Sequence, residues 1–420
     1  MISLHFKNTY FFLVLTLFFS LISCGQNKKP NAETNSTQIS TFSSEEIETG
    51  AQQTALYLEI LENKNIAIVA NQTSVIFKIN SENSEVKDHE INYTHLVDHL
   101  LGLNIAVKKV FSPEHGFRGE ADASEKVENG IDLKTGLPII SLYGNNKKPS
   151  KEQLAGIELV VFDIQDVGVR FYTYISTLHY IMEACAEQNI PVVVLDRPNP
   201  NGHYIDGPTL EIAYKSFVGM HPVPLVYGMT IGEYAQMING EGWLKNNVKC
   251  NLTVIPLKNY THQSTYHLPI RPSPNLPNDK AINLYPSLGF FEGTTINAGR
   301  GTENQFQQYG APFFPKSEFS YLPQPNFGSK HPKHEGKWCF GVNLINTKRL
   351  SHVNLEYLID AYQKTPENEI FFGSTFTVHA GNKLLEQQLK ERKTIQEIQN
   401  SWKPKIEAFK KVRQKYLLYE

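Results

Sequence analysis

Short apolar runs alternate with helical patterns along the first two thirds of the chain. Runs that predict buried strands lie at 65–70, 105–111, 138–143, 159–162, 191–195 and 252–257. Apolar residues with helical spacing lie at 47–61, 94–103, 175–189 and 230–240. A strand buried on both faces shows a continuous apolar run, and alternation of strands with helices is typical of a parallel sheet. The pattern therefore predicts an α/β fold built on a parallel sheet.

The last third of the chain predicts a second, smaller α/β domain. A strand is expected at 339–344, and helices are expected at 355–364 and 401–418. We place the domain boundaries at 48–280 for the parallel-sheet domain and 281–420 for the smaller one. A chain of 420 residues is long enough for two domains of this kind.

Polar side chains follow four of the predicted strands, at the point where each strand ends. In an open parallel sheet, ligands bind in the crevice beyond the carboxyl ends of the strands. These polar positions therefore predict a binding crevice, although each one alone is also compatible with an ordinary solvated loop. The residues are Asn71 after the first strand, Glu114 and His115 after the second, Asp163, Gln165 and Asp166 after the fourth, and Asp196, Arg197 and Asn199 after the fifth.

The 281–420 domain and the segment before it add further polar candidates. Asn275 follows a proline-stiffened stretch, and Glu292 and Asn297 precede Arg300, which has glycine on both sides. Flanking glycines allow the backbone to approach a ligand closely. A plain turn with a surface arginine is the alternative interpretation. No GxGxxG motif follows any strand, so no dinucleotide and no other cofactor is predicted.

The N-terminal segment predicts export and lipid attachment. A basic residue and a short apolar run are typical of a secretory signal, which we assign to residues 1–23. The run ends in Leu21-Ile-Ser-Cys-Gly25, which resembles the bacterial lipobox and implies lipidation of Cys24; a plain signal peptide is the alternative. Residues 24–47 are polar and predict a flexible tether. We expect a membrane-anchored protein of the bacterial cell envelope, on the periplasmic side.

Composition narrows the range of partners. A net charge of −2 gives no electrostatic basis for binding nucleic acid. Beyond Cys24, the cysteines Cys185, Cys250 and Cys339 permit at most one internal disulfide. They form no metal-ligand motif, and no metal site is predicted. Neither the oligomeric state nor the disulfide pairing follows from the sequence.

Several long motifs follow one another along the chain. They are Ser112-Pro-Glu-His-Gly-Phe-Arg-Gly119, Thr135-Gly-Leu-Pro-Ile-Ile-Ser-Leu-Tyr-Gly144, Phe162-Asp-Ile-Gln-Asp-Val-Gly-Val-Arg-Phe-Tyr-Thr-Tyr174, Leu195-Asp-Arg-Pro-Asn-Pro200, Ser273-Pro-Asn275, Glu292-Gly-Thr294 and Gly299-Arg-Gly-Thr302. In this order they resemble the bacterial exo-β-N-acetylmuramidase family, a group of peptidoglycan-recycling glycoside hydrolases. The resemblance covers about residues 50–420.

The resemblance implies removal of terminal N-acetylmuramic acid from the non-reducing end of peptidoglycan fragments. It also implies a Rossmann-like N-terminal domain and an active site in the cleft between the two domains. The residues that we expect to bind the sugar are Asn71, Gln165, Arg170, Tyr174, Asp196, Arg197, Asn199, Asn275, Glu292, Asn297 and Arg300.

Cleavage of a glycosidic bond generally needs one carboxylic acid and a second carboxylate. We expect Glu114 to be the general acid/base, with His115 orienting it or holding a substrate hydroxyl. The second role is open. Asp163 and Asp166 could raise one another's pKa by repulsion, or Asp163 could form a structural pair with Arg170. Alternatively the substrate's own acetamido oxygen attacks, with Tyr172 or Tyr174 polarising the amide.

Muramic acid carries a lactyl carboxylate, and a guanidinium binds carboxylates bidentately. We therefore expect at least one of Arg170, Arg197 and Arg300 to bind this group. Two other classes of function stay open. One is a lipoprotein that binds sugars without cleaving them, and the other is a metal-dependent hydrolase that uses Glu114, His115, Asp163 and Asp166.

Overall fold

The computed structural model describes residues 46–77, 92–118 and 129–420. Residues 45–420 form one compact unit. The predicted signal segment, Cys24 and nearly all of the predicted tether lie outside the described residues. The boundary expected between residues 280 and 281 stays a prediction. Within the described residues, no helix is both long and apolar enough to span a bilayer.

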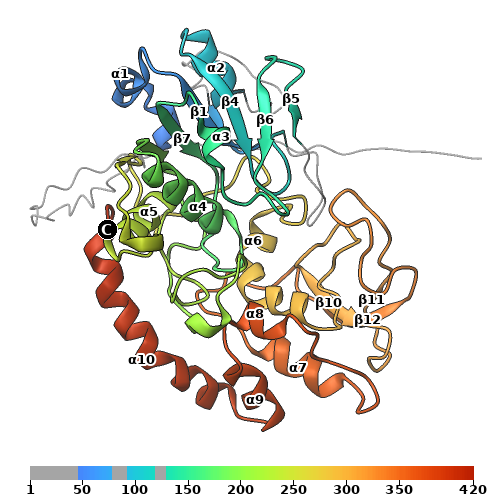
Figure 1. The fold of residues 1–420 in the computed structure, drawn as a ribbon. Helices are drawn as coiled ribbons and strands as arrows, with labels where there is room; N and C mark the ends of the chain where they lie inside the picture. Colours follow the sequence, from blue (N-terminus) through green and yellow to red (C-terminus); the bar gives the residue numbers. More distant parts are fainter. Residues whose placement is uncertain (1–45, 78–91, 119–128) are drawn as a thin grey trace, which may run out of the picture. The chain divides into compact units, whose positions relative to one another are not determined.

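A seven-stranded sheet with the order β5-β6-β4-β1-β7-β8-β9 forms the centre of the fold (Figure 1). All neighbours from β6 to β9 pair in parallel, and only the short edge strand β5 is antiparallel. The predicted parallel α/β sheet is therefore confirmed. The strands are β1 (Ile66–Ala70), β4 (Val107–Ser112), β5 (Gly130–Ile131), β6 (Pro138–Ser141), β7 (Leu159–Asp163), β8 (Val192–Leu195) and β9 (Leu252–Ile255).

Each central strand supplies side chains to two hydrophobic cores. In β7, Val160 and Phe162 pack into the larger core, while Leu159 and Val161 pack into the smaller one. Successive side chains of a strand point to opposite faces, so a strand covered on both faces needs an uninterrupted apolar run. The face with the larger core is covered by α3 (Lys151–Leu154), α4 (Tyr174–Glu187) and α5 (Ile231–Gly240). The face with the smaller core is covered by α1 (Leu58–Leu61) and α2 (Leu96–Gly102).

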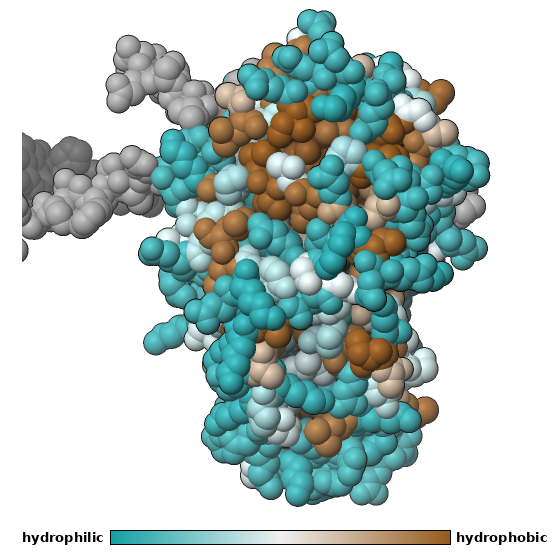
Figure 2. Space-filling model, turned by 60° about the vertical axis from the view of Figure 1, so that its left-hand side comes forward, coloured by the Kyte–Doolittle hydropathy of each residue, from teal (hydrophilic) through white to brown (hydrophobic). Residues whose placement is uncertain are grey.

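The larger core continues into the part of the chain from residue 279 onward, which has a small antiparallel sheet and five α-helices in its described residues. The predicted smaller α/β part is confirmed. Polar side chains cover most of the face in Figure 2, and apolar ones gather in its upper part. The elements are β10 (Gln308–Ala311), β11 (Ser320–Tyr321), β12 (Cys339–Asn343), α6 (Asp279–Leu288), α7 (Glu356–Lys364), α8 (Phe376–Ala380), α9 (Leu384–Lys390) and α10 (Ile395–Arg413).

Two of the expected helices differ from the observed ones. The helix expected at 47–61 is wrong: two 3₁₀ turns precede the short α1, because Gly50 is hydrogen-bonded to the Asp196 carbonyl at the end of β8. The helix expected at 401–418 begins earlier, at Ile395, because Thr394 and Glu397 form a capping box. The remaining small pair, β2 (Val75–Phe77) and β3 (Tyr93–His95), is antiparallel.

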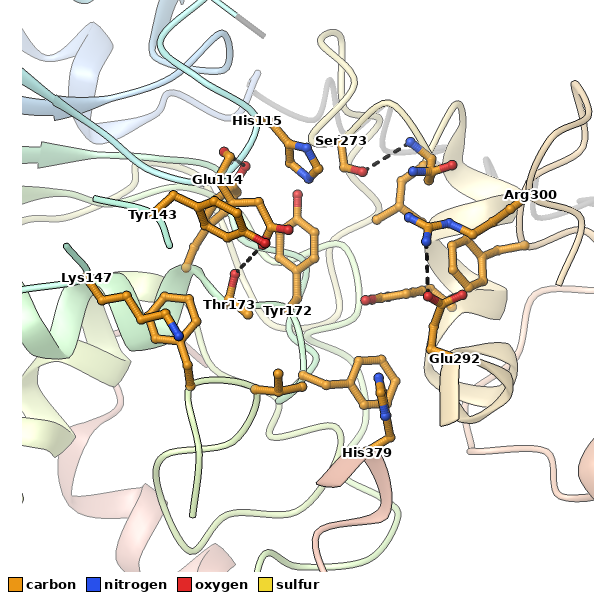
Figure 3. A pocket seen from close by; sticks show the side chains of 18 of the residues that line it. Glu114, His115, Tyr143, Lys147, Tyr172, Thr173, Ser273, Glu292, Arg300 and His379 are labelled. Carbon is orange, nitrogen blue, oxygen red and sulfur yellow. Dashed lines mark hydrogen bonds and ion pairs between the residues drawn. The ribbon is translucent and has the colours of Figure 1, made fainter. Parts of the chain in front are cut away.

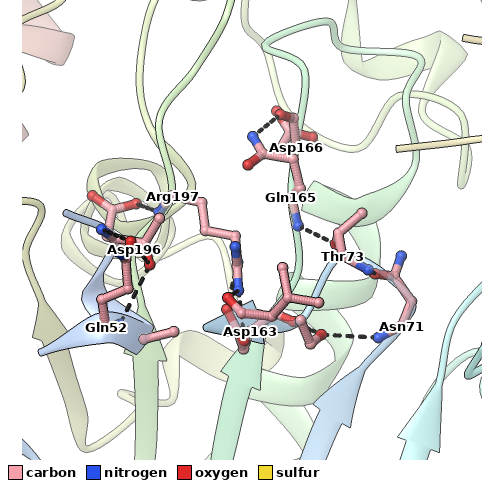
Figure 4. A network of polar contacts seen from close by, with 12 residues as sticks. Gln52, Asn71, Thr73, Asp163, Gln165, Asp166, Asp196 and Arg197 are labelled. Carbon is pink, nitrogen blue, oxygen red and sulfur yellow. Dashed lines mark hydrogen bonds and ion pairs between the residues drawn. The ribbon is translucent and has the colours of Figure 1, made fainter. Parts of the chain in front are cut away.

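The four polar strand ends lie side by side, because β4, β1, β7 and β8 are neighbours and run in parallel. Two of these ends are joined by a buried ion pair (Figure 4). Arg197 donates two hydrogen bonds, of 2.6 and 2.9 Å, to the carboxylate of Asp163, and the two side chains are 2% and 0% exposed. Arg197 also donates to the carbonyl of Val75 beyond β1. Asp163 therefore pairs with Arg197 and not, as the sequence suggested, with Arg170.

The last residues of the chain pack against the end of β8. The Tyr419 hydroxyl donates to the Asp196 carboxylate at 2.7 Å, and the Leu418 amide donates to Glu233 at 2.8 Å. Thr230, the N-cap of α5, donates to the same Asp196 carboxylate at 2.7 Å. We call residues 413–420 the C-terminal clasp.

The Asp163–Arg197 pair gives a stability prediction. Arg197→Met leaves the buried Asp163 carboxylate without its partner, so we expect it to lower the free energy of unfolding by about 3–5 kcal/mol. The measurement is urea denaturation followed by circular dichroism. Lys364→Met is the control, because it removes a half-exposed pair with Asp360 and should cost about 0.5 kcal/mol. Equal effects of the two substitutions would contradict the prediction.

Candidate active site

A cavity of about 480 Å³ lies beyond the carboxyl ends of β4, β6 and β7. Figure 3 shows Glu114, Tyr143 and Thr173 together on one side of it, and Glu292 and Arg300 on the other. The first group comes from loops of the central sheet and the second from the chain beyond α6. The cavity is therefore lined by both predicted domains.

Glu114 and His115 reach the cavity from a tight turn after β4. The Gly116 amide donates to the carbonyl of Pro113, and His115 has a positive φ of 72°. A positive φ is costly for a residue with a side chain, and such strain gathers at functional sites. The His115 side chain is buried. The turn thus directs an acid and an imidazole into the same cavity.

Thr173 fixes the carboxylate of Glu114. Its hydroxyl donates to Glu114 Oε2 at 3.0 Å. Thr173 is the N-cap of α4, yet its side chain makes no capping bond to its own helix. The Glu114 carboxylate therefore lies at the amino end of a 14-residue helix, where the helix dipole favours negative charge.

Tyr172 and Tyr174 form the aromatic floor beside Glu114. Their rings meet edge to face, with centroids 4.8 Å apart. The Tyr172 hydroxyl donates to the Pro272 carbonyl at 2.7 Å, and the Tyr174 hydroxyl accepts from Asn71 at 2.9 Å. Burial raises the pKa of Tyr172 well above its ordinary value, so this phenol stays protonated, with its proton donated to the Pro272 carbonyl.

An ion pair between Glu292 and Arg300 forms the opposite wall, with 3.1 Å between Arg300 Nη1 and Glu292 Oε2. Gly299 and Gly301 on either side of Arg300 have φ of 80° and 78°. Asn297 holds this loop, because its side chain accepts from the Gly299 amide and donates to the Arg300 carbonyl. The glycines on either side of Arg300 thus serve a turn that needs positive φ, and the close approach of a ligand to this backbone stays a prediction.

The charge of Glu292 is fixed by its neighbours. Burial alone would raise its pKa, but the positive charges of Arg300 and Lys333 outweigh burial, and the pKa lies below its ordinary value. Burial lowers the pKa of His379, which lines the cavity nearby. Glu292 is therefore ionised near neutral pH, which suits it to accept hydrogen bonds and not to donate a proton.

The cavity brings together part of the predicted site. The predicted residues that line it are Glu114, His115, Tyr172, Tyr174, Asn275, Glu292 and Arg300. Those that the structure places outside its lining are Asn71, Asp163, Gln165, Asp166, Arg170, Asp196, Arg197, Asn199 and Asn297.

The second group is buried and committed to the scaffold. Arg170 is fully buried and donates to the carbonyls of Pro208, Val223, His379 and Ala380. Asp166 accepts from the Tyr227 hydroxyl and the Gly168 amide, and burial raises its pKa to about 6.

Amides in this group have the same kind of role. Gln165 donates to the carbonyls of Asp166 and Pro198, and Asn199 donates to the carbonyl of Met229. These side chains form their hydrogen bonds inside the buried scaffold, so they hold the strand ends in place. They act on a ligand only by positioning the residues that line the cavity.

The cavity also contains residues that the sequence did not single out. Ser273 and Thr173 stand inside the quoted motifs, so proximity to Asn275 and Tyr174 could have suggested them. Lys147, Phe217 and His379 lie in ordinary polar or mixed segments without any sequence signal. The added residues are Tyr143, Gly144, Lys147, Phe171, Thr173, Phe217, Val218, Ser273, Leu276, Tyr285, Phe306 and His379.

Known proteins match the chain over nearly all of its described length. The family models for the N-terminal and C-terminal parts of the exo-β-N-acetylmuramidase NamZ match residues 66–280 and 283–419. The peptidoglycan β-N-acetylmuramidase NamZ of Bacillus subtilis is 37% identical over 384 residues, which cover 86% of this chain and 89% of that protein. The chain belongs to the NamZ family.

Two solved structures of DUF1343 family proteins from Bacteroides fragilis share the fold of this NamZ family member. One has a TM-score of 0.80 and 45% identity, and the other has a TM-score of 0.72 and 28% identity. Each comparison covers 89% of this chain and 99% of the solved chain. Family membership confirms the predicted class, an enzyme of the glycoside hydrolase type.

The structure also bears on the expected cysteine chemistry and on the metal-dependent alternative. Cys185, Cys250 and Cys339 are buried free thiols. Within the described residues, no group of three or more His, Cys, Asp or Glu side chains is arranged to hold a metal ion. Of the four residues in the metal-dependent alternative, Glu114 and His115 line the cavity, whereas Asp163 is paired with Arg197 and Asp166 with Tyr227.

The bond from Thr173 to Glu114 gives a prediction for this NamZ family member. Thr173→Val removes the hydroxyl that orients the carboxylate, and we expect kcat to fall by about tenfold, as for loss of one hydrogen bond to a charged group. Steady-state hydrolysis of a chromogenic N-acetylmuramide measures the effect.

Thr173→Ser should keep most of the activity because it keeps the hydroxyl. Thr365→Val is the matched control, since the Thr365 hydroxyl donates to the carbonyl of Ala361 at the end of α7 and lies outside the cavity lining. An unchanged kcat in Thr173→Val would refute the orienting role.

Proposed function

We propose that this protein is an exo-acting β-N-acetylmuramidase that releases terminal N-acetylmuramic acid from the non-reducing end of peptidoglycan fragments, with Glu114 as general acid/base. The observation that carries the proposal is the placement of the Glu114 carboxylate in the cavity, held by Thr173 and next to His115. Membership of a family named for this activity supports the substrate class.

Glu114 is suited to the acid role because its carboxylate lines the cavity and accepts a hydrogen bond from the neutral hydroxyl of Thr173. The other lining carboxylate, Glu292, is held ionised by Arg300 and Lys333. A general acid must exchange a proton during the reaction. In its protonated form Glu114 donates to the leaving oxygen, and in its ionised form it accepts a proton from water.

The second step has two available groups. Glu292 is an ionised carboxylate on the opposite wall and can act on the sugar or on water. The 2-acetamido oxygen of the substrate can instead attack the anomeric carbon. For Tyr172 to polarise the acetamide, its hydroxyl would have to turn away from the Pro272 carbonyl, to which it donates its one proton. The first-formed anomer, followed by NMR, distinguishes inversion through a Glu292-activated water from a retaining route.

The catalytic role of Glu114 is tested by Glu114→Gln. We expect kcat on a chromogenic N-acetylmuramide to fall by about 100- to 10,000-fold, the usual contribution of a general acid. Binding of N-acetylmuramic acid, measured by calorimetry, should persist because the amide keeps the size of the side chain. Glu407→Gln, at an exposed position of α10, is the matched control.

The same assay separates the two alternative functions. If the natural protein binds N-acetylmuramic acid but hydrolyses no muramide, it is a binding lipoprotein. Loss of activity on treatment with a chelator, restored by added metal ion, would favour the metal-dependent hydrolase. We expect full activity after chelation.

We propose, in addition, that Cys24 carries the lipid anchor in the cell envelope, on the periplasmic side. The lipobox-like segment at residues 21–25 supports this. Radiolabelled fatty acid should enter the natural protein and not Cys24→Ser, and the variant should move from the membrane fraction to the soluble fraction. Equal labelling of both proteins would exclude this site.

A further inference from the structure

Lys147 lies on the cavity wall opposite Arg300 (Figure 3). It belongs to the loop that follows β6. Its ammonium group lies 4.6 Å from the centroid of the Phe217 ring, which comes from the segment between β8 and α5. The Phe217 ring in turn stacks on Tyr180 of α4, with an interplanar angle of 9° and centroids 6.2 Å apart. Three separate segments therefore combine to hold one cation at the cavity.

This arrangement limits the freedom of a long side chain. A lysine normally loses considerable rotamer entropy when its ammonium is fixed by a ligand. The attraction between the Lys147 ammonium and the Phe217 ring already restricts the side chain in the free protein, so less rotamer entropy is lost when a ligand binds. The stack thus preorganises Lys147 for binding, and it leaves the hydrogen-bond donors of the ammonium available.

Lys147 and the adjacent Lys148 differ in their partners. Within the described residues Lys147 forms no ion pair, whereas Lys148 binds Glu183 and Glu187 at 2.7 and 2.8 Å. The sequence offers two consecutive lysines, and the structure uses Lys148 to tie the loop to α4. Lys147 is left to face the cavity.

Arg300 is less favourable for an added anion. Its guanidinium already binds Glu292, so a substrate carboxylate placed there would approach a second negative charge. Lys147, by contrast, forms no ion pair with any carboxylate in the described part of the chain, and its ammonium lies at the cavity wall against the Phe217 ring. It therefore provides the positive charge that an anionic sugar needs.

We propose that Lys147, held by the Phe217–Tyr180 stack, binds the lactyl carboxylate of the terminal muramic acid and so determines the preference of the cavity for this sugar. The inference rests on the proposed function. It assigns recognition of the carboxylate to Lys147, whereas the sequence led us to expect an arginine in this role. Phe217 is a positioning residue, since it acts through Lys147.

The test is a double-mutant cycle in which the substrate supplies one of the changes. The full-length protein and Lys147→Met are assayed on a chromogenic N-acetylmuramide and on its lactyl methyl ester, which is neutral. We expect Lys147→Met to lower kcat/KM on the free acid by about 10- to 100-fold, chiefly through KM, as for loss of a charged hydrogen bond. On the ester the two proteins should differ by less than about threefold, because the charge that Lys147 recognises is absent.

Lys151→Met is the control for charge, since it removes an exposed lysine four residues away and outside the cavity lining. Phe217→Leu should raise KM for the free acid, by less than Lys147→Met does. Phe217→Tyr keeps an aromatic ring beside Lys147, so its KM should stay close to that of the natural protein. These effects distinguish positioning from a general loss of structure.

Two results would overturn the inference. Equal losses on acid and ester in Lys147→Met would show that Lys147 does not recognise the charge. Discrimination between acid and ester that survives in Lys147→Met and disappears in Arg300→Met would assign the carboxylate to Arg300. If the natural protein hydrolysed neither compound, the proposed function would fail instead, and calorimetric titration with N-acetylmuramic acid would still compare Lys147→Met with the natural protein.

Discussion

The buried ion pair between Asp163 and Arg197 is the constraint on which the catalytic edge of the sheet depends. It joins the ends of β7 and β8 where both strands leave the sheet, and Arg197 extends the link to the segment after β1. Two charges without water are costly unless each is fully satisfied, so the pair tolerates only one arrangement of these three segments. The segment from Gln165 to Tyr174 starts at this fixed point. The positions of Tyr172, Thr173 and, through Thr173, the Glu114 carboxylate follow from it.

The edge of the sheet therefore divides its polar residues into two layers. Residues close to the strand ends, such as Asp166 and Asn199, form their hydrogen bonds with loop backbone and with buried side chains. Residues farther along the loops, such as Glu114 and Thr173, reach the cavity. The division explains how a site can be rigid although it stands on loops, because the loops are held from beneath by closed hydrogen bonds. The opposite wall has the same organisation, because Asn297 lies outside the cavity lining and holds the loop that carries Arg300 through hydrogen bonds to its backbone.

Much of the fold could be predicted because apolar runs and strand burial have the same physical cause. Strands β1, β7 and β8 stand where continuous apolar residues predicted them. Residues 47–61 misled the prediction, since helical spacing cannot reveal that Gly50 is bound to the end of β8. Chain position predicted the edge of the sheet at which the cavity lies and placed Glu114 there, but it could not separate the two layers. Asp163 and Glu114 look alike in sequence, and only the partner of each side chain distinguishes them. Lys147 and Phe217 gave no signal because their significance arises from a contact between distant segments.

The C-terminal clasp has a consequence for how the molecule reaches its final state. The bond from Tyr419 to Asp196 joins residues that are 223 positions apart, and the bond from Leu418 to Glu233 spans 185. Contacts of such sequence separation carry a large loop-closure cost and tend to form late on the folding pathway. With the clasp in place, the Asp196 carboxylate is fully buried. We therefore expect the rate at which the clasp is released to report on the kinetic stability of the β8 end.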